Sequence, residues 1–392
     1  MDDILFFNYN EKSSVLLIFF FNALVFTGLL IKKGIEDKNK ASLWLALFIG
    51  LGGLYICPFM FGYANWYSQD GYREFLYFVP FQQLFLIGPV FYFYVRSLLN
   101  SEEKLHKKDF LHFLPAFAYL GYSLIVFITD VFILDAYYFY SDGRDKDLDF
   151  WYQMAGLLSM LFYLVVSLKF YFNYRRLSLQ ELSFADDIAY KWIKHFAVAF
   201  TAVLLLRVLF FVLNPEWGQF GRKYWYYLCF SILFFFIAIQ GYINTIKTSL
   251  PFRTIGPVNM NTSDIEDSIE VVEEEVVHED QAKKERLVDL FEQEEVYKNP
   301  NLTLTDVAHQ LGTNRNIISK IINQTFKMNF NDFVNQKRAI AVIDKLERGE
   351  HSKRTILSLA LDSGFNSKTT FNRAFKKYAG LSPKQYIEKN SL

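Results

Sequence analysis

Seven long apolar segments in the first 247 residues restrict the fold of this chain more than any other feature. They lie near residues 14–31, 42–63, 76–97, 110–133, 151–172, 194–213 and 224–244. A bilayer core about 30 Å thick requires roughly 20 predominantly apolar residues per helix, and each segment is close to that length. A soluble core rarely contains seven such runs between short polar loops. The sequence therefore predicts a bundle of seven transmembrane helices over residues 1–247.

The Lys and Arg residues of the loops predict the orientation of this bundle. The six successive loops carry 4, 1, 4, 2, 4 and 2 of these residues. Cytoplasmic loops are enriched in Lys and Arg. The alternation therefore places the N-terminus outside and all residues after 247 in the cytoplasm.

Four polar residues in the outer halves of the predicted spans form a candidate ligand pocket: Gln82, Gln83, Asp130 and Arg207. An Arg at mid-membrane costs roughly 2.5–3.5 kcal/mol on insertion scales, so Arg207 is expected to have a partner. Two interpretations stay open. The four side chains could line a site for a small signal molecule that enters from outside. Alternatively, they could form an interhelical ion pair and amide hydrogen bonds that fix helix packing.

Charge is distributed unevenly, although the chain is formally neutral with 41 Lys or Arg and 41 Asp or Glu. Residues 261–280 contain nine acids and no Lys or Arg, whereas residues 301–392 contain 15 Lys or Arg against 7 Asp or Glu. One-sided charge with few aromatic residues predicts a flexible acidic linker over residues 248–280. The basic domain that follows, residues 281–392, is expected to bind a polyanion.

Two similar units in the C-terminal domain each predict a helix-turn-helix. In both units an Ala lies four residues before a Gly, as Ala308 before Gly312 and as Ala360 before Gly364. A small residue lets two helices cross closely, and Gly permits the positive φ that such a turn requires. Two units in tandem, joined by the amphipathic stretch FNDFVNQKRAIAVIDKLE, are a strong signal.

The second helix of each unit has an apolar stripe and a polar face. Asn314 and Ser367 are expected to cap these helices. The stripes are predicted to be Ile318, Ile321 and Ile322 in the first helix, and Phe371, Ala374 and Phe375 in the second. The opposite faces carry Arg and Lys, which can contact guanine in the major groove, and Asn, which can contact adenine.

The second unit, SGFNSKTTFNRAFKKYAGLSP, resembles the AraC/XylS family of bacterial transcription regulators. It follows the family signature of Gly-Phe, Phe, Arg-x-Phe-Lys and Gly-x-Ser-Pro, and the resemblance covers about residues 283–390. The resemblance implies two helix-turn-helix units that are held by a linker helix and place recognition helices in successive major grooves of double-stranded DNA. The implied base-contacting residues are Arg315, Asn316, Ser319 and Lys320 in the first helix, and Lys368, Thr369, Asn372 and Arg373 in the second.

Five further basic residues are expected to contact DNA phosphates, which position a protein without specifying sequence. They are Lys337, Arg338, Lys353, Arg354 and Lys377. The alternative for each is an ordinary solvated charge.

The expected fold class is all-α: a seven-helix transmembrane bundle followed by an α-helical tandem helix-turn-helix domain. We expect a transcription regulator in the bacterial inner membrane whose partners are double-stranded DNA, the lipid bilayer and an unidentified small-molecule signal. Many family members carry a soluble sugar-binding or dimerisation domain where this chain has apolar segments, so the family's usual ligands do not carry over. The choice between monomer and homodimer stays open.

Three hypotheses for the membrane part stay open. It could sense a signal as part of a one-component transducer, it could only anchor or dimerise the regulator, or it could be a transporter or an enzyme. The six His residues form no HExxH pair, and the chain has no GxSxG motif or P-loop, so neither a catalytic residue nor a metal or other cofactor is expected. Pro residues fall in the second to fourth spans and not in matching halves, unlike in many transporters.

Overall fold

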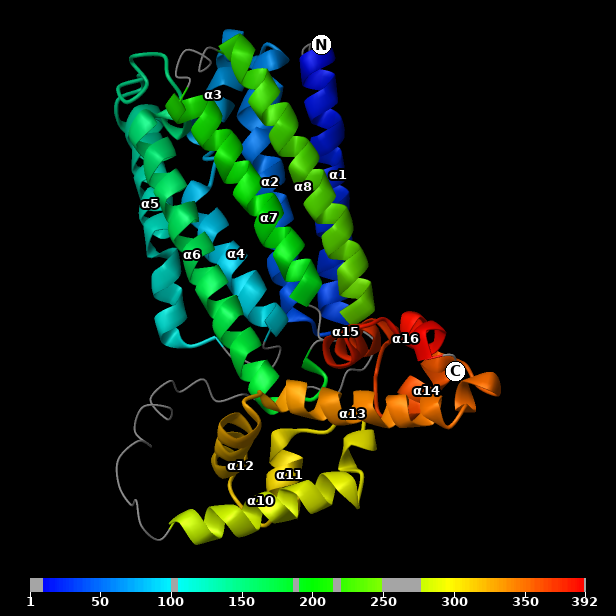
Figure 1. Ribbon diagram of the computed structural model, residues 1–392. Helices are drawn as coiled ribbons and strands as arrows, with labels where there is room; N and C mark the ends of the chain where they lie inside the picture. The colour runs from blue at the N-terminus through cyan, green and yellow to red at the C-terminus, as the bar shows by residue number, and fades with distance from the viewer. Residues whose placement is uncertain (1–9, 100–104, 186–189, 214–219, 249–275, 391–392) are drawn as a thin grey trace. The chain divides into compact units, whose positions relative to one another are not determined.

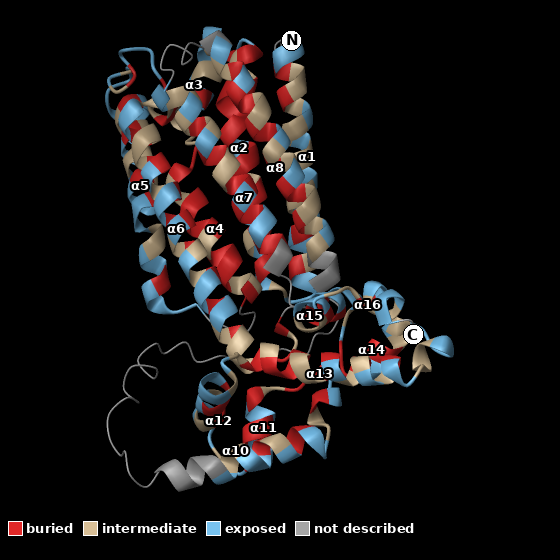
Figure 2. Ribbon diagram, viewed as in Figure 1, coloured by how far each residue is buried: buried red, intermediate tan, exposed pale blue. Residues whose placement is uncertain are grey.

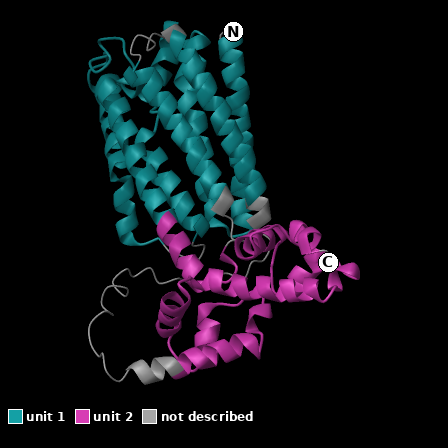
Figure 3. Ribbon diagram, in the orientation of Figure 1, with its two compact units in different colours: residues 1–171, 191–258 teal, residues 172–190, 259–392 magenta. Residues whose placement is uncertain are grey.

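The computed structural model describes residues 10–99, 105–185, 190–213, 220–248 and 276–390. The regular elements among these residues are helices, apart from one isolated β-bridge, so the predicted all-α class is confirmed. The chain divides into two compact units (Figure 3). Unit 1 comprises residues 1–171 and 191–258, and unit 2 comprises residues 172–190 and 259–392.

Unit 1 is built mainly from long helices that run side by side (Figure 1). Its α-helices are α1 (Glu11–Glu36), α2 (Lys40–Tyr63), α3 (Asp70–Phe78), α4 (Leu84–Leu99), α5 (Leu114–Phe127), most of α6 (Phe150–Glu181), α7 (Tyr190–Val208) and α8 (Phe220–Thr248). The shorter 3-10 and π elements are η1 (Trp66–Ser68), η2 (Lys107–Phe113), η3 (Ile128–Ile133), η4 (Lys146–Leu148) and η6 (Leu209–Leu213).

Six helical segments in the described part of the chain are long and apolar enough to cross a membrane, by length and composition. They are Glu11–Glu36, Lys40–Tyr63, Lys107–Ile133, Phe150–Glu181, Trp192–Leu213 and Arg222–Asn244. Helix α2 is the most enclosed, because 72% of its apolar window is buried against 11% for α1. It packs against α1, α4 and α8. Exposed residues follow the outer faces of the surrounding helices in Figure 2.

The third predicted span is not a continuous helix. Helix α3 ends at Phe78, Val79 is extended with φ −90° and ψ 113°, and the shorter apolar helix α4 starts at Leu84. The cause is Pro80, because the residue before a proline is driven out of the α conformation. The sequence prediction of one helix over residues 76–97 was therefore wrong, and Gln82 and Gln83 lie in the break.

Unit 2 contains the two helix-turn-helix motifs (Figure 1). Its elements are α10 (Val276–Glu292), η8 (Val296–Lys298), α11 (Leu304–Gln310), α12 (Arg315–Ile321), η9 (Ile322–Phe326), α13 (Phe330–Glu347), η10 (Glu350–Ser352), α14 (Ile356–Asp362), α15 (Lys368–Ala379) and α16 (Pro383–Asn390). It also includes the end of α6, although the sequence alone had assigned residues 1–247 to one domain. Most of the predicted acidic linker, residues 249–275, lies outside the described residues.

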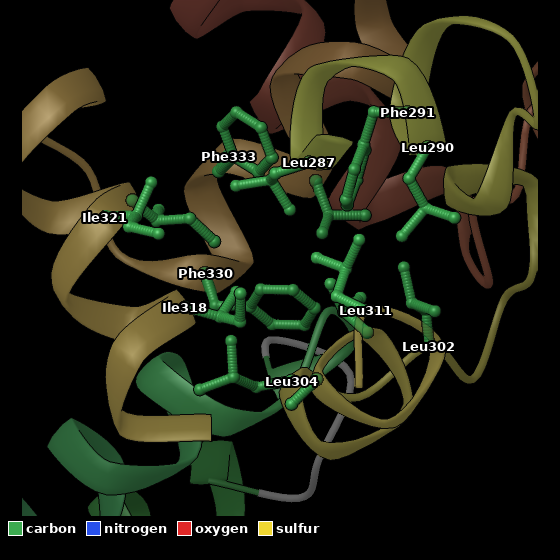
Figure 4. Close-up of a cluster of buried hydrophobic side chains, with 14 of the residues drawn as sticks. Leu287, Leu290, Phe291, Leu302, Leu304, Leu311, Ile318, Ile321, Phe330 and Phe333 are labelled. Atoms are coloured by element: carbon green, nitrogen blue, oxygen red, sulfur yellow. The ribbon is translucent and has the colours of Figure 1, made fainter. Parts of the chain in front are cut away.

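Each helix-turn-helix has its own hydrophobic core. The first core is formed by α10, α11, α12 and the start of α13, and includes Leu287, Phe291 and Ile318 (Figure 4). The second is formed by the end of α13 with α14 and α15. Helix α13 enters both cores, with Phe333 in the first and Val342 in the second. It therefore acts as a rigid link between the two motifs.

Candidate nucleic-acid interface and buried polar network

Local chemistry sets both turns and both recognition helices as predicted. Gly312 and Gly364 have φ values of 63° and 93°, a region that favours glycine. The Asn314 side chain caps α12 by accepting a hydrogen bond from the Asn316 N–H, and Ser367 caps α15 by accepting one from the Thr370 N–H. The predicted apolar stripes are buried, namely Ile318, Ile321 and Ile322 in α12 and Phe371, Ala374 and Phe375 in α15.

The residues proposed to contact bases lie opposite these stripes. The exposed ones are Arg315, Asn316, Lys320, Lys368, Thr369, Asn372 and Arg373, and Ser319 is half-buried. Ser319 accepts a hydrogen bond from Asn323 Nδ2 at 3.3 Å. Arg315 is the first residue of α12 and lies 3.5 Å from the Glu181 carboxylate. Both recognition helices thus present donors and positive charge on one face, which suits the major groove.

Three of the residues proposed to contact phosphates form ion pairs inside unit 2. Lys337 pairs with Glu292 at 3.0 Å, Lys377 pairs with Asp332 at 2.8 Å, and Arg354 pairs with Asp362. The fourth, Lys353, is exposed in the turn before α14. Partly exposed ion pairs of this kind contribute little to stability. Each basic side chain can therefore leave its acidic partner for a DNA phosphate at little cost in free energy.

The prediction that Arg338 contacts a DNA phosphate was wrong. Its side chain is 1% exposed and donates hydrogen bonds to the Tyr297 and Asn299 carbonyl oxygens at 2.8 and 2.7 Å. It also donates to Ser183 Oγ at 3.1 Å. Buried charge is tolerated when it is fully hydrogen-bonded, and here the guanidinium holds the chain around η8 against α13. In this structure Arg338 is a packing residue and is not positioned to contact phosphate.

Two buried asparagines of α13 were missed by the sequence reasoning. Asn331 donates to the Leu182 and Ser183 carbonyl oxygens at 3.2 and 3.0 Å. Asn335 donates to Asn331 Oδ1 at 3.1 Å. Because the partners of Asn331 lie about 150 residues earlier in the chain, no local pattern could have identified its role.

In unit 1, Arg207 is buried and hydrogen-bonded to neutral groups. It donates to Tyr55 Oη at 3.0 Å, to Gln153 Oε1 at 2.6 Å and to the Gln153 carbonyl at 3.0 Å. Gln153 donates in turn to Gln82 Oε1 at 2.7 Å. Gln82 also donates to the Tyr55 carbonyl at 3.0 Å. Two residues of the predicted pocket, Arg207 and Gln82, therefore meet through Gln153, which the sequence reasoning did not single out.

The other two predicted pocket residues bond elsewhere. Gln83 donates to the Pro80 carbonyl at 2.5 Å, within the break before α4. Asp130 accepts from the Phe139 N–H at 3.2 Å, in the turn that follows η3. The small cavity beside Arg207 is lined mainly by apolar side chains, among them Tyr55, Ile87, Met160, Phe200, Val203, Tyr226, Phe230 and Phe234. Of the four residues of the predicted pocket, the structure thus brings together only Arg207 and Gln82.

A buried carboxylate pair extends the network beyond Gln82. Asp147 accepts from the Gln82 N–H at 2.9 Å and from Tyr119 Oη at 2.6 Å. Asp145 accepts from Tyr67 Oη at 2.8 Å and from the Asp147 N–H at 3.0 Å. Burial raises the pKa of both carboxyls, and repulsion from Asp147 raises the pKa of Asp145 further. In sequence these acids are part of DGRDKDLD, which is typical of a solvated loop.

Comparison with known proteins locates the family likeness in unit 2. Residues 307–389 match the model of a helix-turn-helix domain family. The melibiose operon regulatory protein of Escherichia coli K12 is 32% identical over 85 residues, which are 22% of this chain and 27% of that protein. An uncharacterised helix-turn-helix transcriptional regulator of Staphylococcus aureus strain COL is 28% identical over 99 residues, which are 24% of this chain and 12% of that protein. No solved structure matches.

The chain therefore spans about a quarter or less of the length of these curated relatives. The likeness covers the two motifs and α13, and does not reach unit 1. The C-terminal domain is a helix-turn-helix domain of the AraC type, and the proteins that share it are transcription regulators.

Proposed function

We propose that this chain is a membrane-embedded, sequence-specific transcription regulator that acts as a one-component sensor. A signal received by the helices of unit 1 would change how the helix-turn-helix domain occupies promoters. The signal is a small molecule that binds two states of the bundle with different affinities, because only differential binding shifts such an equilibrium. The partners are double-stranded DNA, through the major groove, and the bilayer.

The observation that carries the DNA-binding part is the pair of capped recognition helices. Each presents Arg or Lys together with Asn on the face opposite its buried stripe. The relatives that share the domain are regulators by name, which supports the same conclusion. A single chain with two motifs would place α12 and α15 in neighbouring major grooves, about one helical turn apart.

The observation that supports membrane embedding is the exposure of large apolar side chains along the long helices. Phe21, Val165 and Val198 are each more than 60% exposed near the middle of α1, α6 and α7, respectively. A water-soluble protein rarely exposes extended apolar surface of this kind, whereas hydrocarbon accommodates it without cost. We place the N-terminus outside and unit 2 in the cytoplasm, from the distribution of Lys and Arg.

The same function can be tested on the full chain in two steps. The first is fractionation of expressing bacteria, in which the protein should stay with the membrane after an alkaline carbonate wash. The second is reconstitution into lipid nanodiscs and selection from random-sequence DNA at physiological salt, with empty nanodiscs as the control. An enriched motif with two half-sites about one helical turn apart is expected.

Other outcomes would change the assignment. Binding without sequence enrichment would leave only the electrostatic attraction to phosphate and would contradict a sequence-specific regulator. A chain that the carbonate wash releases would contradict membrane embedding while leaving DNA recognition intact. An anchor without a sensing role remains the second candidate, because the polar groups around Arg207 are already satisfied by one another.

A further inference from the structure

Helix α6 is longer than a membrane requires. Its 32 residues extend for about 48 Å at 1.5 Å per residue, whereas a bilayer core is about 30 Å thick. The apolar run ends near residue 172, and the helix continues as NYRRLSLQE to Glu181. This extension belongs to unit 2, as its colouring in Figure 3 shows.

The extension buries one face within unit 2. Tyr174, Ser178 and Leu182 recur at every fourth position and are buried, while Arg175 and Arg176 are exposed. This periodicity is that of a helix with a single contact face. The last turn of α6 is therefore a packed element and not a frayed end.

After the helix, the chain pairs with the start of the first helix-turn-helix. The Ser183 N–H donates to the Leu302 carbonyl at 3.1 Å, and Leu182 forms an antiparallel β-bridge with Thr303. Thr303 is the N-cap of α11. The docked residues Leu182, Ser183 and Ala185 are at most 1% exposed. Backbone pairing fixes the register of this docking.

Helix α13 holds the docked segment from the other side. Asn331 donates to the Leu182 and Ser183 carbonyl oxygens, and Arg338 donates to Ser183 Oγ. Asn331 is 1% exposed, on a helix whose neighbouring buried residues are mostly apolar. A buried amide in such a place is costly unless it is paired, and the described partners of its Nδ2 are carbonyls of this segment. The surface of α13 thus offers buried side-chain donors to the docked segment.

Docking also places a carboxylate beside the first recognition helix. Glu181 lies 3.5 Å from Arg315, the first residue of α12 and a residue proposed to contact a base. The N-terminal residues of a recognition helix are those that enter the groove. A carboxylate at this position competes with DNA for Arg315 and repels the phosphates.

We propose that residues 174–185 form a docking segment that restrains DNA binding by the first helix-turn-helix, with Glu181 occupying Arg315 in the restrained state. The inference rests on the proposed function and adds the route by which a signal in unit 1 would change DNA binding. The chain passes through α6 directly from unit 1 into this segment, so a movement of α6 reaches Arg315 without involving residues 249–275. DNA binding and docking of the segment are then mutually unfavourable.

The test measures DNA affinity of the full chain in nanodiscs, using the double-stranded site that the wild-type chain selects. Glu181→Gln should tighten binding about three- to fivefold at low salt, because the partly buried ion pair with Arg315 and the repulsion between Glu181 and the phosphates are removed. Glu388→Gln is the matched control, since it makes the same charge change on α16 at an exposed acid that pairs with Lys384. The control should change affinity less than about 1.5-fold. In an Arg315→Ala background the effect of Glu181→Gln should be smaller.

Hydrogen exchange of the Ser183 amide provides the second readout. This amide should be protected in the DNA-free chain and should exchange faster when DNA is saturating. Equal effects of Glu181→Gln and Glu388→Gln, or a Ser183 amide that stays equally protected on DNA, would each overturn the inference while the proposed function stands. A wild-type chain without sequence preference would instead contradict the proposed function itself.

Discussion

Arg373 and Lys353 represent the two kinds of DNA contact that the proposed function requires. Arg373 lies on the exposed face of α15, and Lys353 lies in the turn before α14. Arg373→Ala should cost roughly 1–3 kcal/mol and relax the preference at one base pair, because a bidentate contact is lost. Lys353→Ala should weaken all sequences about equally and reduce the salt slope by about 1.

Titrations of the selected site and its single mismatches at several salt concentrations separate these two effects. Each variant is the control for the other, since both remove one positive charge. An unchanged base preference in the Arg373→Ala chain would mean that the exposed face of α15 does not contact bases.

Arg338 should behave as a packing residue. Arg338→Ala leaves the Tyr297 and Asn299 carbonyl oxygens without their charged donor. We expect the free energy of opening of α11 and α13 to fall by roughly 3 kcal/mol. Lys337→Ala is the matched control, since its partly exposed pair with Glu292 should change the same quantity by less than about 1 kcal/mol. Hydrogen exchange of the backbone amides in α11 and α13 measures the free energy of opening in both variants. Equal losses in Arg338→Ala and Lys337→Ala would show that burial of Arg338 does not contribute to stability.

At the scale of elements, the two turns offer a matched pair of glycines. Both have positive φ, but a Cβ on Gly364 would lie 2.3 Å from the Tyr297 carbonyl oxygen, whereas a Cβ on Gly312 would meet nothing within 4 Å. Gly312→Ala should therefore cost only about 1–2 kcal/mol, for the left-handed conformation. Gly364→Ala should cost clearly more, because the backbone must also move. Thermal unfolding of unit 2 compares them, and equal costs would show that the close approach at Gly364 can relax.

The features of the elements that the sequence predicted correctly are those that depend on neighbouring residues. The caps Asn314 and Ser367, the glycine turns and the apolar stripes each depend on residues within a few positions of one another. The burial of Arg338 could not be predicted, since its carbonyl acceptors lie about forty residues earlier in the chain. The break at Pro80 was masked because apolar residues continue on both sides of it.

Long-range pairing explains the remaining differences. Gln82 meets Arg207 through Gln153 and Tyr55, and the Asp145 and Asp147 pair is buried by tyrosines from other helices. The residues Leu182 and Ser183 after α6 read as part of a polar loop in the sequence, because their partners lie more than a hundred residues later in the chain. Neither the contacts around Gln82 nor the buried carboxylate pair leaves a periodic signal in its own segment.

At the scale of the whole molecule, Arg207 connects the helices that would have to move in a sensor. Its partners Tyr55 and Gln153 belong to α2 and α6, while Arg207 itself is on α7. Because α6 also carries the docking segment, the position of α6 links the buried network to Arg315 through a single helix. A membrane part that only anchors the chain does not require this link.

Arg207→Leu distinguishes a sensor from an anchor. The variant chain should still insert in the membrane, since Leu is more apolar than Arg. However, the hydrogen bonds that join Arg207 of α7 to Gln153 of α6 are lost. With α6 less constrained, the docking segment should release more readily, and DNA affinity of the full chain in nanodiscs should rise about fivefold or more. Leu205→Ala is the control, because Leu205 lies on the same helix and is 65% exposed. Unchanged DNA affinity in a stably inserted Arg207→Leu chain would favour an anchor, because the buried network would then have no energetic connection to the DNA-binding helices.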